Sequence, residues 1–158
     1  MNKDGFSEGD HPRDKSGRFT DKIVMYESAS GGKVTKSYAG TPKEEAQNLS
    51  AAKVLADKKG WNVELRYNTP NRKSADAKIN GEDWEIKTNY TPTASAVDSA
   101  IKNAKGQARN VILHIQSDIE TKDAVNAVKW RLARKNHYDK VLIITKGNAL
   151  ISIVRKEE

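Results

Sequence analysis

The sequence SADAKINGEDWEIKTN, residues 74–89, contains the pattern that decides the fold of this chain. Asn80-Gly81 is a strong signal for a tight turn between two strands. The residues on either side of the turn, 75–79 and 83–87, carry the apolar and β-branched content expected of a hairpin. We therefore predict two adjacent antiparallel strands at this point.

Three charged side chains flank the predicted turn. Successive side chains alternate between the faces of a strand, so Glu85 and Lys87 share one face, and the turn brings Asp76 back beside them. Two carboxylates can hold a hard divalent cation through oxygen, and such a cation polarises a phosphoryl oxygen. Lys87 can stabilise negative charge on an attacked phosphate. The pattern predicts phosphodiester hydrolysis, although a Glu–Lys pair on a strand is also typical of a solvated face.

Alternating helices and strands are expected on both sides of the hairpin. Upstream, Thr41 can cap a helix that Gly60 ends. Its apolar stripe consists of Ala46, Leu49, Ala52, Leu55 and Ala56. The remaining expected elements are strands at 61–65, 111–115, 140–145 and 149–154, and helices at 95–109 and 121–135. The resulting order, αβββαβαββ, predicts a mixed sheet flanked by helices.

Residues 1–40 differ in composition from the rest of the chain. They are rich in glycine and charge and show little apolar periodicity, which predicts a flexible basic tail or linker. Only residues 23–26 have the character of a short strand or a docking segment. The folded domain is accordingly expected to span residues 41–158.

The charge balance restricts the class of partner. The chain has 158 residues, a net charge of +7 and no cysteine. Positive charge favours a polyanionic partner, nucleic acid before membrane, although a merely soluble basic protein is the alternative. Without cysteine, disulfides and cysteine-ligated zinc are excluded. No apolar run approaches the length that spans a bilayer, so we expect no membrane partner.

The element order and the acidic hairpin resemble the PD-(D/E)xK nuclease superfamily, the restriction-endonuclease-like fold with an αβββαβ core. In this chain Ala75 stands where the family signature has proline. The resemblance implies a nuclease core with an added helix and a C-terminal β-hairpin. The segments KEEAQNLSAAKVLADKKGWNVEL, SADAKINGEDWEIKTN and SAIKNAKGQARNVILHI are further similar to the tRNA nuclease domains at the C-termini of contact-dependent growth-inhibition toxins. This likeness extends over about residues 42–154, and its matching positions are 52–56, Asp76, Gly81, Glu85, Lys87 and Gln107.

This second resemblance implies a metal-dependent endoribonuclease toxin that cleaves tRNA. Asp76 and Glu85 would bind Mg²⁺ or a similar ion, and Lys87 would stabilise the transition state. Glu45, in the first turn of the first helix, would complete the site. Glu44 is the alternative if the helix phase differs by one residue. Compensation of the helix dipole is the other explanation for both acids.

Further residues are candidates for substrate binding. Lys102, Lys105 and Arg109 are predicted on one side of the second helix, where they would line a path for phosphates. Gln107 would contact a base or the scissile phosphate, and Thr88 follows the catalytic strand. An ordinary solvated surface is the alternative explanation for these side chains.

Two other functions remain open at this stage. One is a DNA endonuclease on the same scaffold, and the other is a non-catalytic nucleic-acid-binding phage structural module. The second arises because HPRDKSGRFT, residues 11–20, resembles a segment of phage minor head proteins. The toxin resemblance implies action in the cytoplasm, delivery from a larger secreted or phage-particle protein, and an acidic immunity protein or antitoxin as partner.

Overall fold

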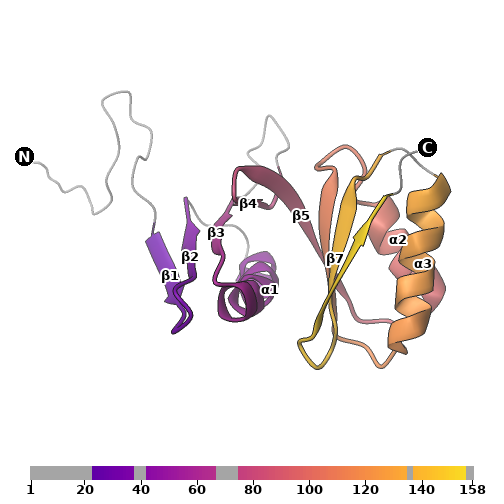
Figure 1. Ribbon diagram of the computed structural model, residues 1–158, viewed down its shortest axis with the longest axis horizontal. Helices are drawn as coiled ribbons and strands as arrows, with labels where there is room; N and C mark the ends of the chain where they lie inside the picture. The colour runs from indigo at the N-terminus through magenta and orange to yellow at the C-terminus, as the bar shows by residue number, and fades with distance from the viewer. Residues whose placement is uncertain (1–22, 38–41, 67–74, 135–136, 156–158) are drawn as a thin grey trace, which may run out of the picture.

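The computed structural model describes residues 23–37, 42–66, 75–134 and 137–155. These residues form eight strands and three helices (Figure 1). The strands are β1 (Ile23–Glu27), β2 (Lys33–Lys36), β3 (Asn62–Leu65), β4 (Ala77–Ile79), β5 (Glu82–Asn89), β6 (Asn110–Ile115), β7 (Lys140–Ile144) and β8 (Leu150–Val154). The helices are α1 (Pro42–Lys59), α2 (Ala94–Lys102) and α3 (Thr121–Arg134).

All eight strands belong to one mixed sheet, in which their spatial order follows their order in the chain. The pairs β2–β3, β5–β6 and β6–β7 are parallel, and the other neighbouring pairs are antiparallel. Each parallel pair is joined by a helix, because a parallel connection must return to the starting edge of the sheet. Thus α1, α2 and α3 connect β2 to β3, β5 to β6, and β6 to β7.

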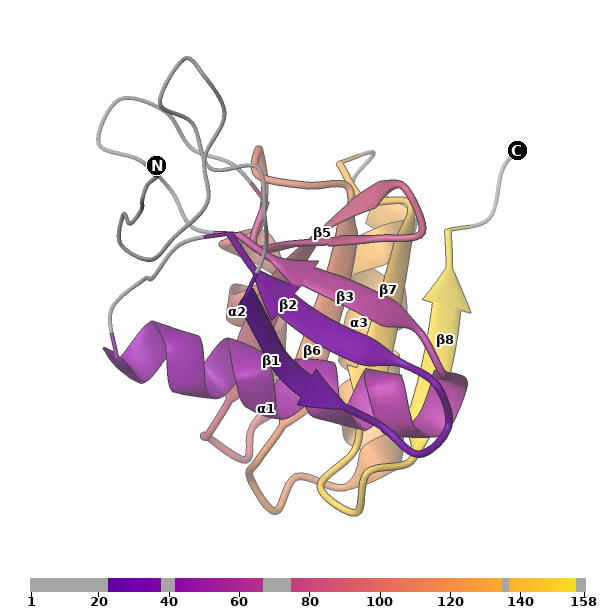
Figure 2. The ribbon, with the colours of Figure 1, turned by 90° about the vertical axis from the view of Figure 1, so that its left-hand side faces the viewer.

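The helices cover opposite faces of the sheet. On one face α1 crosses β1, β2 and β3 (Figure 2) and buries Ala51, Ala52 and Leu55 against them. On the other face α2 and α3 lie side by side and bury apolar side chains against β6 and β7 (Figure 1). Strand β6 is apolar throughout its centre because it is buried on both faces: Ile112 faces α1, whereas Val111 and Leu113 face α2 and α3.

From Pro42 onward the observed order of elements is the predicted αβββαβαββ, and the mixed sheet flanked by helices is confirmed. The second helix is shorter than predicted, because α2 ends at Lys102 rather than at residue 109. Residues 103–107 continue as turns. From Ala104 on, backbone N–H groups donate to carbonyls three residues earlier, and Gly106 has a positive φ of 85°. A residue with that backbone angle cannot continue an α-helix.

The structure also differs from the predicted flexible tail, because residues 23–36 form strands β1 and β2 of the sheet. Val34 is fully buried, and a side chain at Gly32 would meet the carbonyl oxygens of Trp61 and Ala56 at 2.6 and 2.7 Å. Both strands are short, and Val34 is the one buried residue in them, which leaves little apolar alternation to detect in the sequence. The segment 11–20, which resembles phage proteins, lies outside the described residues.

Candidate active site

The candidate site lies where the pairing between β4 and β5 ends. The turn residues Asn80 and Gly81 have positive φ angles of 53° and 84°, as the predicted tight turn requires. Strand β4 pairs with β5 only as far as Trp84, whereas β6 pairs with β5 as far as Asn89. The second half of β5 therefore runs along β6 alone, and its other edge lies beside the residue that precedes β4, which is Asp76.

Asp76 is fixed against this edge by a backbone contact. Its Oδ2 accepts a hydrogen bond from the backbone N–H of Ile86 at 2.9 Å. Only 7% of Asp76 and 3% of Glu85 is exposed. The hairpin thus brings together two buried carboxylates that stand nine residues apart in the chain, as the sequence predicts.

Lys87 lies beside these carboxylates. Its Nζ is 3.5 Å from Oε2 of Glu85, and 25% of its side chain is exposed. Glu85 and Lys87 pair in register with Val111 and Leu113, so both point to the face of the sheet that α2 and α3 cover. An ammonium group thus lies at the border between the buried acids and solvent.

Both carboxylates resist ionisation in the metal-free protein. Burial, reinforced by the charge of Asp76, raises the pKa of Glu85 to about 8, although Lys87 opposes this shift. Burial also raises the pKa of Asp76; the hydrogen bond from Ile86 opposes that rise, whereas the charge of Glu44 adds to it. Two acids that repel each other in a buried place form a site that a cation would stabilise.

The donor set fits a hard divalent cation. Oε1 of Glu85 is buried and has no hydrogen-bond partner within the described part of the chain, so one ligand oxygen is unused. Among the described residues, no group of three or more His, Cys, Asp or Glu side chains is arranged as metal ligands. Mg²⁺ is commonly held by only one or two carboxylates and keeps several waters. Asp76 and Glu85 would be those two ligands.

The two acids at the start of α1 have different surroundings. Oε2 of Glu45 is 2.6 Å from Nζ of Lys36, so Glu45 forms a salt bridge that links α1 to β2. Glu44 is the acid of α1 whose charge acts on Asp76. Of the two acids, only Glu44 thus contributes to the raised pKa of Asp76, and a role of either acid in the site stays a prediction.

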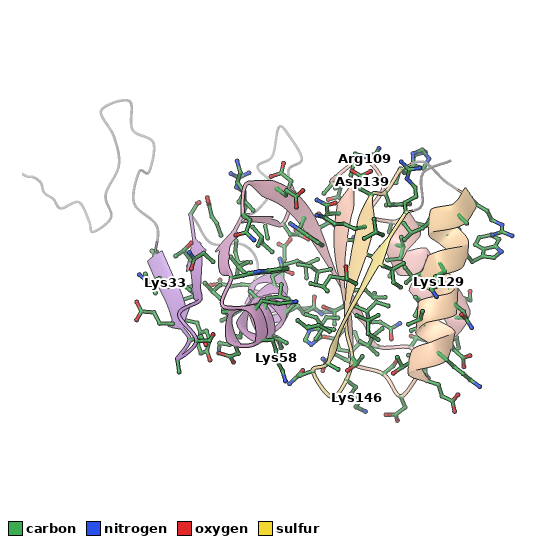
Figure 3. The ribbon with its side chains drawn as sticks, viewed as in Figure 1. Lys33, Lys58, Arg109, Lys129, Asp139 and Lys146 are labelled. Carbon is green, nitrogen blue, oxygen red and sulfur yellow. The ribbon has the colours of Figure 1, made fainter. Side chains whose placement is uncertain are left out.

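The predicted substrate residues do not gather on one helix face, because α2 ends at Lys102. Thr88 is half-buried on β5, and Lys102 and Lys105 are exposed. Nε2 of Gln107 donates to the carbonyl of Asn103 at 3.4 Å. Arg109 forms a bidentate ion pair with Asp139 near the start of β6 (Figure 3). Its Nε and one terminal guanidinium nitrogen donate to the two carboxylate oxygens at 3.1 and 2.9 Å. Of these residues only Thr88 lies on β5 with Glu85 and Lys87.

Asn48 is a buried polar residue near the site that the sequence prediction did not single out. This residue of α1 is 4% exposed, and its Nδ2 has no hydrogen-bond partner in the described structure. It lies one turn after Glu44 on the same side of the helix. The signal in the sequence is its spacing: Asn48 stands four positions after Glu44 and in helical register with the apolar residues Ala51 and Leu55.

A family model described as the contact-dependent growth inhibition CdiA C-terminal domain matches residues 73–150. This part of the chain is similar to the CdiA C-terminal domains. The matched segment begins just before Asp76 and contains the hairpin with Glu85 and Lys87, both later helices and β7.

A solved structure supports the same fold over a longer part of the chain. It is described as the CdiA-CT/CdiI toxin and immunity complex from Burkholderia pseudomallei. The TM-score is 0.60 at 20% sequence identity, and the alignment covers 78% of this chain and 99% of the other. The mixed α/β architecture is therefore that of a CdiA C-terminal toxin domain. No curated protein sequence matches the chain.

Proposed function

We propose that this chain is the toxin domain of a contact-dependent growth-inhibition protein and that it cleaves tRNA as a metal-dependent endoribonuclease. One observation carries the catalytic part of this proposal: the buried pair Asp76 and Glu85 with the ammonium group of Lys87 at 3.5 Å. The similarity of residues 73–150 to CdiA C-terminal domains supports the toxin part. The PD-(D/E)xK resemblance supports the reaction class.

Each residue of the hairpin has a separate task in this proposal. Asp76 and Glu85 hold the cation, and Glu44 adds negative charge beside them. When bound, the cation would polarise a phosphoryl oxygen and favour ionisation of the attacking water. Lys87 donates to the phosphate oxygens as negative charge develops on them. The hydrogen bond from Ile86 keeps the Asp76 carboxylate turned toward the strand that carries Glu85.

The surface charge supports a polyanionic substrate. The net charge is +7, and exposed lysines project from separate elements around the molecule, among them Lys33, Lys58, Lys129 and Lys146 (Figure 3). Several of them form salt bridges with nearby acids, including Lys146 with Asp118. Charge spread in this way suits a large folded nucleic acid rather than a small anion. Among nucleic acids we favour tRNA because of the resemblance to tRNA nuclease domains.

A cell that makes this nuclease needs protection from it. We propose a cognate immunity protein that is acidic, in keeping with the net charge of +7, and that covers the site of Lys87. The B. pseudomallei structure of the same fold is described as a toxin and immunity complex, which supports such a partner. We further propose that the domain is delivered as part of a larger protein and acts in the cytoplasm of the recipient cell. No helix in the described ranges is long and apolar enough to cross a bilayer.

The test is a comparison of substrates. Purified protein is incubated with total tRNA and, separately, with plasmid DNA, each with Mg²⁺ and with a chelator. We expect tRNA cleavage that needs Mg²⁺ and intact DNA. Cleavage of the plasmid alone would indicate a DNA endonuclease instead. Binding that the chelator does not affect, without cleavage of either substrate, would support the non-catalytic phage module and contradict our proposal.

A further inference from the structure

Asn48 is a buried polar residue of α1 that the proposed site does not use. It is 4% exposed, and its Nδ2 has no hydrogen-bond partner in the part of the chain that the structure describes. An unpaired amide in a packed interior destabilises a fold, and an apolar side chain of similar size would avoid that loss. The amide therefore needs a partner that does not belong to the described residues.

Contacts on either side of Asn48 show where it lies. Glu44, one turn earlier, acts through its charge on Asp76. Nε2 of Gln47 is 3.0 Å from the hydroxyl of Tyr90, the residue directly after β5. This segment of α1 therefore runs along the second half of β5, from the carboxylate pair to the end of the strand.

Among the strands that the structure describes, none pairs with the edge of β5 next to this segment. Strand β4 pairs with β5 no further than Trp84. Lys87 and Thr88 on this half of β5 are only half-buried, so solvent reaches the edge. Because Thr88 alternates with Lys87, it points toward α1, whereas Lys87 points toward α2. A ligand at this edge would have α1 with Asn48 on one side and Lys87 on the other.

We infer that Asn48 binds the nucleic acid substrate by donating a hydrogen bond from Nδ2 to a phosphate oxygen at the open edge of β5. The group is a donor, as a phosphate requires, and it is held in a site whose known charges already suit a phosphodiester and its cation. This inference rests on the proposed function. It adds a substrate contact from α1, on the side of β5 opposite to Lys87.

The experiment compares Asn48→Leu with Asn110→Leu. Asn110 is the control: it is also an asparagine and is 7% exposed, and its Oδ1 lacks a partner in the described structure. Its Nδ2, unlike that of Asn48, donates to the carbonyl of Asp83 at 3.3 Å, so Asn110→Leu should not raise the melting temperature. It begins β6, beside Trp84 rather than beside the second half of β5. For each variant we would measure the melting temperature, kcat and KM for tRNA cleavage with Mg²⁺, and tRNA binding in chelator.

We expect Asn48→Leu to fold, with a melting temperature about 2–4 °C above wild type, because the unpaired amide is gone. Its kcat/KM should fall by about ten- to a hundredfold, the loss expected for a hydrogen bond to a charged group, and tRNA binding in chelator should weaken. Asn110→Leu should cleave at the wild-type rate. A purely structural asparagine would give the higher melting temperature with full cleavage, and that result would overturn the inference.

Two further outcomes are decisive. If Asn48→Leu does not fold, Asn48→Ala tests the same point, because it removes the donor without adding bulk or a buried charge. Full cleavage by Asn48→Ala would then overturn the inference. If wild-type protein cleaves no nucleic acid, the proposed function fails, and the binding measurement decides: equal tRNA affinity of wild type and Asn48→Leu would overturn the inference as well.

Discussion

Glu85 is held where an ionised carboxylate is unfavourable. It is almost fully buried, its Oε1 has no partner in the described structure, and the second carboxylate, Asp76, lies beside it. Lys87 offsets this only in part. An acid in such a position destabilises the metal-free protein whenever it is ionised, and a bound cation would remove that penalty. The stability of the protein should therefore report on the site.

The pH dependence of stability tests this property of Glu85. Its pKa is raised in the folded state from 4.5 to about 8, so its contribution to stability is present below pH 4.5 and is lost as the pH rises through 8. In chelator, the melting temperature of Glu85→Gln should exceed that of wild type by an amount that grows across this range. Saturating Mg²⁺ should reduce the difference. Parallel melting curves for the two proteins at every pH would contradict the raised pKa.

Lys87→Ala tests the residue proposed to stabilise the attacked phosphate. We expect cleavage to fall by about 10²- to 10³-fold, because a donor that stabilises developing negative charge is removed. The circular dichroism spectrum should be unchanged, since Lys87 is partly exposed. Lys129→Ala, the same change at an exposed position of α3, is the control and should retain activity. Full activity of folded Lys87→Ala would remove this residue from the mechanism.

At the scale of elements, sequence reasoning succeeded where a local rule fixes the geometry. The Asn80-Gly81 turn and strand alternation place Asp76, Glu85 and Lys87 together, and the structure agrees. The end of α2 and the choice between Glu44 and Glu45 were not predictable in this way. Both depend on helix phase and on tertiary neighbours such as Lys36, which the sequence prediction had left in a flexible tail.

The hairpin turn gives a test at this scale. Gly81 has a φ of 84°, so Gly81→Ala should lower the free energy of unfolding by about 1–2 kcal/mol through backbone strain. Gly147→Ala is the matched control, because that glycine lacks a positive φ and its added Cβ would meet nothing within 4 Å. Urea unfolding of both variants provides the comparison. Equal stability of the two would show that the strained turn does not hold the hairpin.

At the scale of the whole molecule, the sheet extends further than the sequence indicated. Strands β1 and β2 add an edge to the predicted core, and Lys36 of β2 pairs with Glu45 of α1. Such short strands lack the alternation that identifies longer ones, so only the packing of Val34 and the close approach at Gly32 reveal them. The domain predicted from residue 41 onward therefore lacks β1 and β2, two of the strands that α1 packs against.

The overall charge leads to a prediction about binding. With a net charge of +7, tRNA affinity should fall steeply with salt, and the logarithm of the affinity should decrease linearly with the logarithm of the salt concentration. Titrations in chelator at several salt concentrations measure the slope without cleavage. An affinity that does not change with salt would show that phosphate contacts contribute little.

The most direct test of the central claim is tRNA cleavage by wild type, Glu85→Gln and Lys87→Ala, assayed together with increasing Mg²⁺. The account predicts cleavage by wild type that saturates with Mg²⁺. Glu85→Gln should be inactive at Mg²⁺ concentrations that saturate wild type, because one of the two cation ligands is lost. Lys87→Ala should cleave about 10²- to 10³-fold more slowly than wild type at every Mg²⁺ concentration. Cleavage by Glu85→Gln with the Mg²⁺ dependence of wild type would contradict the claim that this hairpin holds the catalytic cation.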